Sequence, residues 1–171
     1  MGDESGDSAS PTKAEDKKHS PARKIKRANS KRKGELSEAA FLLKATSLGF
    51  GVAKPWGDSE RYDFILDSRE RLWRVQVKSV GTLRDRAYYV NAQRRIGRGV
   101  VPYAPSEIDF LVAHVIPESA WFIIPVEAIM HVKTLRLYPR GDPKGDYRRY
   151  REAWQLMKRR GENRSPRLCS S

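Results

Sequence analysis

The chain has 171 residues, enough for one domain of ordinary size with tails but too few for two separate hydrophobic cores. Its 34 Lys and Arg exceed its 21 Asp and Glu by 13, and this positive charge favours a polyanionic partner over a small neutral ligand. The single cysteine, Cys169, excludes an internal disulfide and a cysteine zinc site, and the longest apolar run, residues 121–126, is too short to cross a bilayer. We therefore expect a soluble intracellular protein, cytoplasmic and nucleoid-associated, or nuclear in a eukaryote.

Lysine and arginine are concentrated near the two ends of the chain. Residues 17–33 carry nine of them and no acid, with Ile25 as one isolated larger aliphatic residue. Because such a segment buries too little apolar surface to offset the loss of chain entropy, we expect residues 1–33 to be a disordered basic tail. The run either binds nucleic acid loosely or serves as a nuclear address. Residues 158–171 are also basic and are expected to be flexible, which leaves 34–157 as the folded domain.

Hydrophobic patterning predicts one long helix, several strands and a closing helix. Residues 35–48 lack Gly and Pro and are apolar almost all round, which predicts a helix that is packed over most of its surface and ends at Gly49. Strands are expected over residues 50–54, 62–67, 72–80, 87–93, 110–116 and 121–124. The remaining elements are a basic glycine loop at 94–99, a helical turn at 126–130 and a helix at 147–157. This order is typical of an α/β or α+β domain.

The polar turn at residues 68–71 suggests a register for the two strands around it. If Asp67 pairs with Leu72, side-chain alternation separates two faces. One face collects Tyr62, Phe64, Leu66, Trp73, Val75 and Val77, and the opposite face collects Arg61, Asp63, Gln76 and Lys78. A slip of one residue would place Asp63 or Gln76 among the aromatic rings. The register therefore predicts an acid, a carboxamide and a lysine within a few ångströms of one another.

These three residue types suit metal-assisted hydrolysis of a phosphodiester. A hard cation binds a non-bridging phosphate oxygen and generates hydroxide from water, and Mg²⁺ needs only one or two protein carboxylates beside its waters. Asp63 would supply the charge, while the Gln76 side chain and the Val77 carbonyl would supply neutral oxygens. Lys78, two residues after Gln76, would offset charge on the phosphate. We expect Mg²⁺ as the cofactor, with Mn²⁺ as the alternative ion; the competing interpretation is an exposed sheet face with a surface ion pair.

The order and spacing of these residues also match a known family. The chain resembles the PD-(D/E)XK nuclease superfamily, and within it the group I intron-associated endonucleases, over about residues 34–126. The motifs that carry the resemblance are Gly34-x-x-x-Glu38, Pro55-Trp56-Gly57, Tyr62-Asp63, Gln76-Val77-Lys78 and the segment ending in Pro125. The resemblance implies a restriction-endonuclease-like mixed sheet flanked by helices and metal-dependent cleavage of DNA. Gln76 stands where most members have an acid, and the intron-associated branch resembles this chain in carrying glutamine.

Glutamine at position 76 lacks the negative charge of an acid, and a glutamate on the first predicted helix could restore that charge to the site. Glu38 takes the family's glutamate position and would bind metal or activate water. Glu35 is its rival, and its structural alternative is to complement a helix N-terminus.

Further polar residues are candidates for DNA contact. Arginines in or near the glycine loop can approach phosphates, and two amides can read adenine edges or simply face solvent. These candidates are Arg84, Arg86, Asn91, Gln93, Arg94, Arg95 and Arg98. We expect His114 and His131 to be packed rather than metal-bound.

Since one site per chain must make two cuts in a duplex, we expect a homodimer or homotetramer acting on double-stranded DNA. A DNA-binding protein with a decayed nuclease site and a junction-resolving or repair nuclease remain the alternatives.

Overall fold

A single α-helix leads into the sheet of the folded domain. The computed structural model describes residues 21–57, 59–141 and 145–158, with side chains from residue 29 onward. Helix α1 spans Pro21–Ser47, and the chain divides into two compact units, 1–33 and 34–171. We expected order to begin near Gly34, but the helix begins at Pro21. Lysine, arginine and alanine favour helix, and proline suits a first helical turn.

Helix α1 is packed along one stripe. Ser37, Phe41 and Ala45, spaced four residues apart, are buried, and Gly49 follows the helix in a left-handed conformation at φ +88°. In contrast, Leu36 is 61% exposed and Leu43 is 74% exposed. The expectation of a helix packed over most of its surface was therefore wrong. No helix within the described residues is long and apolar enough to cross a membrane.

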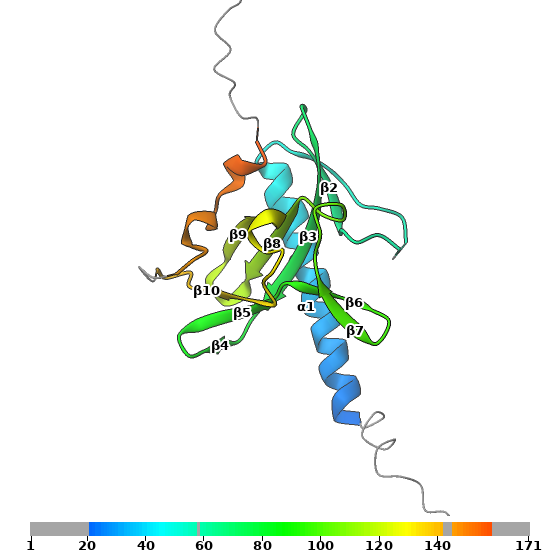
Figure 1. The fold of residues 1–171 in the computed structure, drawn as a ribbon, viewed down its shortest axis with the longest axis vertical. Helices are drawn as coiled ribbons and strands as arrows, with labels where there is room; N and C mark the ends of the chain where they lie inside the picture. The colour runs from blue at the N-terminus through cyan, green and yellow to red at the C-terminus, as the bar shows by residue number, and fades with distance from the viewer. Residues whose placement is uncertain (1–20, 58, 142–144, 159–171) are drawn as a thin grey trace, which may run out of the picture. The chain divides into compact units, whose positions relative to one another are not determined.

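The central sheet has five strands in the order β1-β2-β3-β8-β9 (Figure 1). Their bounds are β1 Gly51–Ala53, β2 Phe64–Asp67, β3 Leu72–Val80, β8 Phe110–Val115 and β9 Ala120–Pro125. The β3–β8 pair is parallel and the other pairs are antiparallel, so the sheet is mixed. This confirms a mixed α/β domain. The expectation of several flanking helices was wrong, because α1 is the one α-helix among the described residues.

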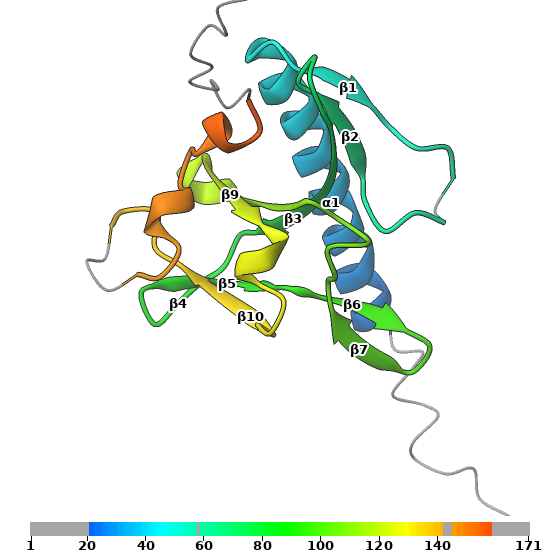
Figure 2. The same cartoon turned by 45° about the horizontal axis from the view of Figure 1, so that its top comes forward.

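The two faces of this sheet are covered by different elements. One core contains Phe41 and Ala45 of α1 together with the sheet residues Phe64, Leu66, Val75, Val77, Val112 and Ile123. The other core joins alternate residues of β8 and β9 to a small three-stranded sheet. The small sheet is ordered β10-β5-β4, with β4 Leu83–Arg84, β5 Ala87–Asn91 and β10 Thr134–Leu137 (Figure 2). The domain is thus layered as helix, large sheet and small sheet.

The basic glycine loop is a hairpin. Strand β6, Gln93–Ile96, pairs with β7, Gly99–Pro102, so that Arg94 and Arg95 lie on a strand and Gly97 and Arg98 form the turn. Gly97 has φ +55°, which a glycine adopts without strain. The hairpin β8–β9 and the turn at η3, Val126–Ala128, confirm the corresponding predictions.

The predicted helix at 147–157 was wrong. Two short 3₁₀ turns take its place, η4 Arg148–Tyr150 and η5 Trp154–Leu156. Between them Arg151 forms a β-bridge to Phe122, and the Glu152 carboxylate accepts hydrogen bonds from the Trp121 N–H at 2.8 Å and the Trp154 Nε1–H at 2.9 Å. These contacts to β9 replace the hydrogen bonds that a helix would make. The predicted tails lie largely outside the described residues.

The two histidines differ. His114 of β8 stacks on Trp121 with ring centroids 3.9 Å apart, and its Nδ1 lies 3.0 Å from the Ser37 hydroxyl of α1. Burial lowers the pKa of His114, as expected for a packed neutral ring. His131 is exposed, so the expectation that it is packed was wrong.

Candidate active site

Asp63 lies immediately before β2 and contacts the neighbouring strand β3. Its backbone N–H donates to the Val75 carbonyl at 2.9 Å. Its Oδ2 accepts hydrogen bonds from the Gln76 Nε2 at 2.5 Å and from the Val77 N–H at 2.7 Å. The structure therefore brings Asp63 together with Gln76 and Val77, as the sequence predicted.

The register that places these residues is the predicted one. Phe64 pairs with Val75, Leu66 with Trp73 and Asp67 with Leu72, so the apolar side chains of both strands share the face toward α1. Tyr62 departs from the prediction, because regular pairing starts at Phe64 and the Tyr62 ring packs against the opposite core.

The Asp63 carboxylate carries its charge at a cost in solvation. Burial raises its pKa above the ordinary aspartate value, and nearby Glu38 raises it further. The hydrogen bond from the Val77 N–H, the charge of Lys78 and the Gln76 amide lower it, without cancelling the effect of burial. A carboxylate whose pKa is raised by burial, with a second carboxylate nearby, is a candidate functional group.

Glu38 of α1 forms an ion pair with a residue that sequence reasoning missed. Its Oε2 lies 2.8 Å from the Lys54 Nζ, and this ammonium lies 5.8 Å from the centroid of the Phe64 ring. Lys54 follows β1, whose register against β2 carries it toward Phe64. The sequence shows only a lysine directly after a short strand, and this pattern is too common to identify Lys54 as a partner of Glu38.

A cavity of about 180 Å³ joins Glu38 to Asp63. It is lined by Glu38, Lys54, Pro55, Gly57, Glu60, Tyr62 and Asp63. Glu35 does not line it, and because α1 begins at Pro21, Glu35 cannot complement the helix N-terminus as proposed for it. The geometry favours Glu38 over Glu35.

The oxygen donors around this cavity suit a hard divalent cation. No three His, Cys, Asp or Glu side chains gather closely enough to hold a metal ion among the described residues. Asp63 and Glu38 nevertheless provide two carboxylates, and Mg²⁺ keeps several of its waters. The Gln76 amide donates its Nε2 hydrogens to Asp63 and to the Val77 carbonyl at 3.2 Å, so ligation through its oxygen requires the amide to rotate.

Lys78 lies further along β3 on the same face as Gln76. Both side chains are half-buried, and the Lys78 Nζ lies 5.6 Å from the centroid of the Tyr103 ring. A cation held against an aromatic face keeps its charge available for a phosphate.

Comparison with known proteins agrees with this geometry. The sequence profile of the PD-(D/E)XK endonuclease family matches residues 28–157, which is most of the chain. The chain belongs to the PD-(D/E)XK endonuclease family. Its structure is similar to that of a bacterial homing endonuclease, I-Ssp6803I, with a TM-score of 0.66 and 32% sequence identity over 75% of this chain and 92% of that one. No match was found among curated proteins.

In the present chain the predicted DNA contacts fall into two groups. Arg94 turns inward and pairs with Glu107, with its Nε 2.7 Å from the Glu107 Oε2. Burial would raise the pKa of Glu107, but the Arg94 hydrogen bond and the Ala104 N–H outweigh it and lower that pKa. Arg94 is therefore engaged within the fold, and its contact with DNA stays a prediction.

The other candidates remain at the surface of the endonuclease. Arg84, Arg86, Arg95, Arg98 and Asn91 are exposed, and Gln93 is half-buried. The Asn91 Oδ1 accepts a hydrogen bond from the Gln93 N–H at 2.9 Å, which leaves its amide nitrogen for a partner.

Proposed function

We propose that this endonuclease hydrolyses phosphodiester bonds of double-stranded DNA with Mg²⁺ as its cofactor and Mn²⁺ as an alternative. The observation that carries the proposal is the Asp63 carboxylate, joined to Gln76 and Val77 on β3 and facing Glu38 across one cavity. Lys78 on the same strand supplies a positive charge for the phosphate.

Each residue of the site would have a distinct task. Asp63 and Glu38 would hold the cation, with the Gln76 oxygen and the Val77 carbonyl as neutral ligands. The bound ion supplies a Lewis acid for the phosphate and lowers the pKa of a coordinated water. Glu38 would also accept a proton from water in the cavity, and Lys78 would neutralise charge that develops on the phosphate oxygens.

Incubation of the purified chain with supercoiled plasmid and Mg²⁺ tests this function. We expect nicked and then linear DNA, and no cleavage with EDTA. DNA binding without cleavage at any Mg²⁺ or Mn²⁺ concentration would favour a DNA-binding protein with a decayed site. Faster cleavage of a four-way junction than of a duplex would favour a junction-resolving enzyme.

The two glutamates of α1 should differ sharply in their effect on this reaction. We expect Glu38→Gln to lower the cleavage rate by a factor of about 10² to 10⁴, because a positioned carboxylate is lost. Glu35→Gln is the matched control on the same helix and should retain most of the activity. Single-turnover rates on plasmid measure both, and the reverse ranking would remove Glu38 from the site.

Substitution of Gln76 should change the metal requirement. In Gln76→Glu a second carboxylate replaces the amide that lies 2.5 Å from Asp63, so the Mg²⁺ concentration for half-maximal cleavage should fall. Gln76→Ala removes the ligand and should raise that concentration. The rate at saturating Mg²⁺ need not improve, because tighter ground-state binding helps only if it persists in the transition state. A requirement that neither variant alters would show that Gln76 is not a ligand.

We also propose that the endonuclease acts as a homodimer or homotetramer, since a duplex needs two cuts. An apolar stripe on α1, formed by Leu36, Ala39 and Leu43 at helical spacing, is exposed and is available to a second copy. We expect Leu43→Glu to yield monomers by light scattering and to nick plasmid without linearising it. Leu72→Glu, at another exposed leucine, is the control and should remain oligomeric. A wild-type monomer that linearises plasmid would contradict this assembly.

A further inference from the structure

The outer face of the small sheet carries an arrangement that the active site does not use. Its inner face, with Tyr88, Val90, Leu135 and Leu137, is buried in the core. On the outer face Arg136 of β10 lies opposite Tyr89 of β5, and Thr134 lies opposite Asn91. Arg84 of β4 lies opposite Ala87 on the same side.

Arg136 is exposed and held by aromatic rings. Its guanidinium carbon lies 5.7 Å from the centroid of the Tyr89 ring and 6.0 Å from that of Tyr138. Within the described part of the chain it forms no ion pair, unlike Arg94 or Arg74. A cation–π contact of this kind leaves the charge of the guanidinium in place.

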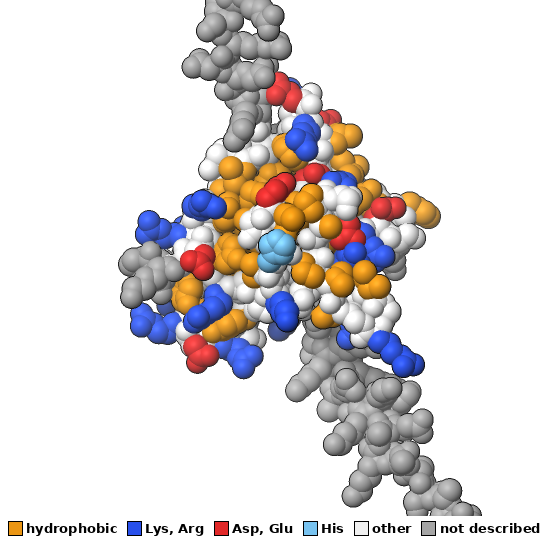
Figure 3. All heavy atoms as spheres, in the orientation of Figure 1, with side chains coloured by type: hydrophobic (Ala, Val, Ile, Leu, Met, Phe, Trp, Pro, Cys, Tyr) orange, Lys and Arg blue, Asp and Glu red, His pale blue; other side chains and the backbone are white. Residues whose placement is uncertain are grey.

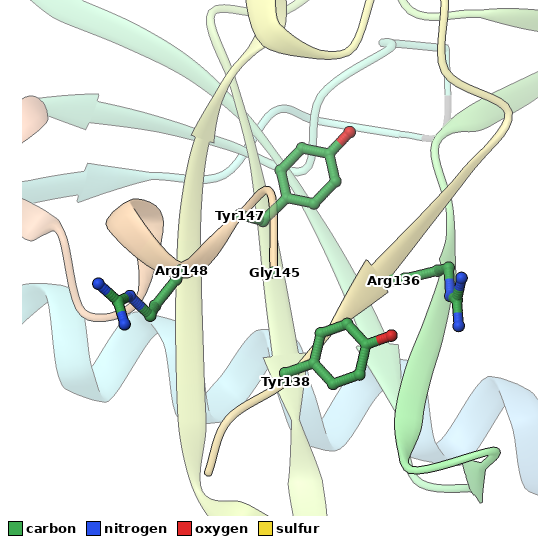
Figure 4. A pocket seen from close by; sticks show the side chains of 5 residues that line it. All are labelled: Arg136, Tyr138, Gly145, Tyr147 and Arg148. Carbon is green, nitrogen blue, oxygen red and sulfur yellow. The ribbon is translucent and has the colours of Figure 1, made fainter. Parts of the chain in front are cut away.

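A shallow hollow beside β10 does not account for the exposed position of Arg136. It is lined by Arg136, Tyr138, Gly145, Tyr147 and Arg148 (Figure 4). The guanidinium groups of Arg136 and Arg148 point away from each other in that view, so they do not converge on one small anion.

The chemistry of the outer face fits a nucleic acid duplex. Along β5 the pairs Ala87–Arg84, Tyr89–Arg136 and Asn91–Thr134 follow one another, and strands β4, β5 and β10 contain no Asp or Glu. Lysine and arginine side chains gather over this part of the molecule (Figure 3). Guanidinium, amide and hydroxyl groups can donate hydrogen bonds to base edges as well as to phosphates.

The length and continuity of these strands also fit a duplex. Strand β5 continues through buried Ala92 directly into β6, so the small sheet and the β6–β7 hairpin lie end to end (Figures 1 and 2). Residues 87–96 extend over roughly 30 Å at about 3.3 Å per residue, close to one turn of DNA. The major groove admits an antiparallel β-ribbon of this kind.

We propose that the outer face of the small sheet, formed by Arg84, Tyr89, Asn91, Thr134 and Arg136, reads base sequence in the major groove, with Arg136 recognising guanine. This inference rests on the proposed cleavage of double-stranded DNA and adds β10, which sequence analysis missed, to the DNA-contacting elements. Arg136 is a specificity-determining residue and takes no part in the chemistry.

Selection of bound duplexes from a random library tests the proposal, with the full chain carrying Lys78→Met so that it binds without cutting. The wild-type surface should enrich a defined sequence. Both Arg136→Gln and Arg136→Lys should lose preference for guanine at one or two positions, by about 5- to 150-fold, because lysine cannot reproduce bidentate contacts. Arg69→Gln, an exposed arginine on the β2–β3 turn, is the matched control and should leave the selected sequence unchanged.

Several outcomes would overturn the inference. A lysine variant that behaves like wild type, or uniform weakening with an unchanged selected sequence, would make Arg136 a phosphate contact. An unaltered affinity and sequence in all Arg136 variants would show that DNA does not reach this face. Plasmid cleavage by the unmodified chain with no enriched sequence would refute sequence reading while the proposed nuclease function stands, whereas absence of both cleavage and DNA binding would refute the function itself.

Discussion

Asp63→Asn is expected to abolish DNA cleavage and, in the same protein, to raise the melting temperature. Cleavage should fall by a factor on the order of 10³ or more, because the carboxylate that holds the cation is lost. The metal-free fold should gain stability, because burial raises the pKa of Asp63 and the ionised form is therefore unfavourable in the folded state. Asparagine keeps the shape and one acceptor for the Val77 N–H. Each kcal/mol relieved corresponds to about 2–4 °C in a chain of this size.

The pH dependence of this gain follows from the direction of the shift. A folded pKa above the unfolded value means that the folded state binds the proton more tightly, so the ionised carboxylate destabilises the protein above the folded pKa. The advantage of Asp63→Asn should be largest at neutral pH. It should vanish as the pH falls through the raised pKa of Asp63, where the wild-type group is itself neutral.

Calorimetric melting with EDTA at neutral pH and near the ordinary aspartate pKa measures both effects. Asp67→Asn, at the end of β2, is the matched control, because exposed Asp67 accepts a hydrogen bond from the Arg69 N–H at 2.6 Å and does not line the cavity of Glu38 and Asp63. That variant should keep its activity and gain no stability. A lower melting temperature for Asp63→Asn at neutral pH would contradict an unfavourable buried charge.

Lys78→Met should separate catalysis from metal binding. We expect a loss of cleavage on the order of 10² to 10³, the range found when one positively charged or hydrogen-bonding group is removed from a transition state. Metal affinity should stay near the wild-type value, because the ammonium lies against Tyr103 and its proposed role is to neutralise charge on the phosphate. The methionine side chain preserves the apolar contact with the ring.

Lys54→Met provides the contrast. Its ammonium lies 2.8 Å from Glu38 in the metal-free site, so its removal frees a carboxylate and should strengthen metal binding. Titration calorimetry with Mg²⁺ and Mn²⁺ compares the two variants. Equal changes in metal affinity for both lysines would show that Lys78 is also part of the metal site.

The central hairpin could be predicted from sequence because its information is local. A four-residue polar turn, together with Asp63 and Gln76 as polar residues that must avoid the apolar face, determines one register and with it the contact of Asp63 with Gln76. The same reasoning missed Lys54, because its approach to Glu38 depends on how β1 pairs with β2 and on the rotation of α1. Neither is visible in the residues around Lys54.

Very short strands, and strands whose partners lie far away in the sequence, could not be predicted. Strand β4 has two residues, and β10 pairs with β5, from which it is separated by four intervening strands. The segment 147–157 has a helical pattern, but Glu152 adopts φ +51° and its carboxylate binds the edge of β9. There tertiary hydrogen bonds override the local preference.

The parallel pairing of β3 with β8 has a consequence for how such a protein can change over time. The crossover that joins these adjacent strands, residues 81–109, holds β4 to β7 and every candidate DNA contact except Thr134 and Arg136 of β10. Its end is fixed to β3, because the Arg74 backbone N–H and guanidinium both donate to Asp109. Doubling the length of a loop costs only about 0.6 kcal/mol in closure entropy, so this crossover can be lengthened or exchanged while the scaffold keeps its register. New target preferences can therefore evolve in a module that is physically separate from the hydrolytic residues.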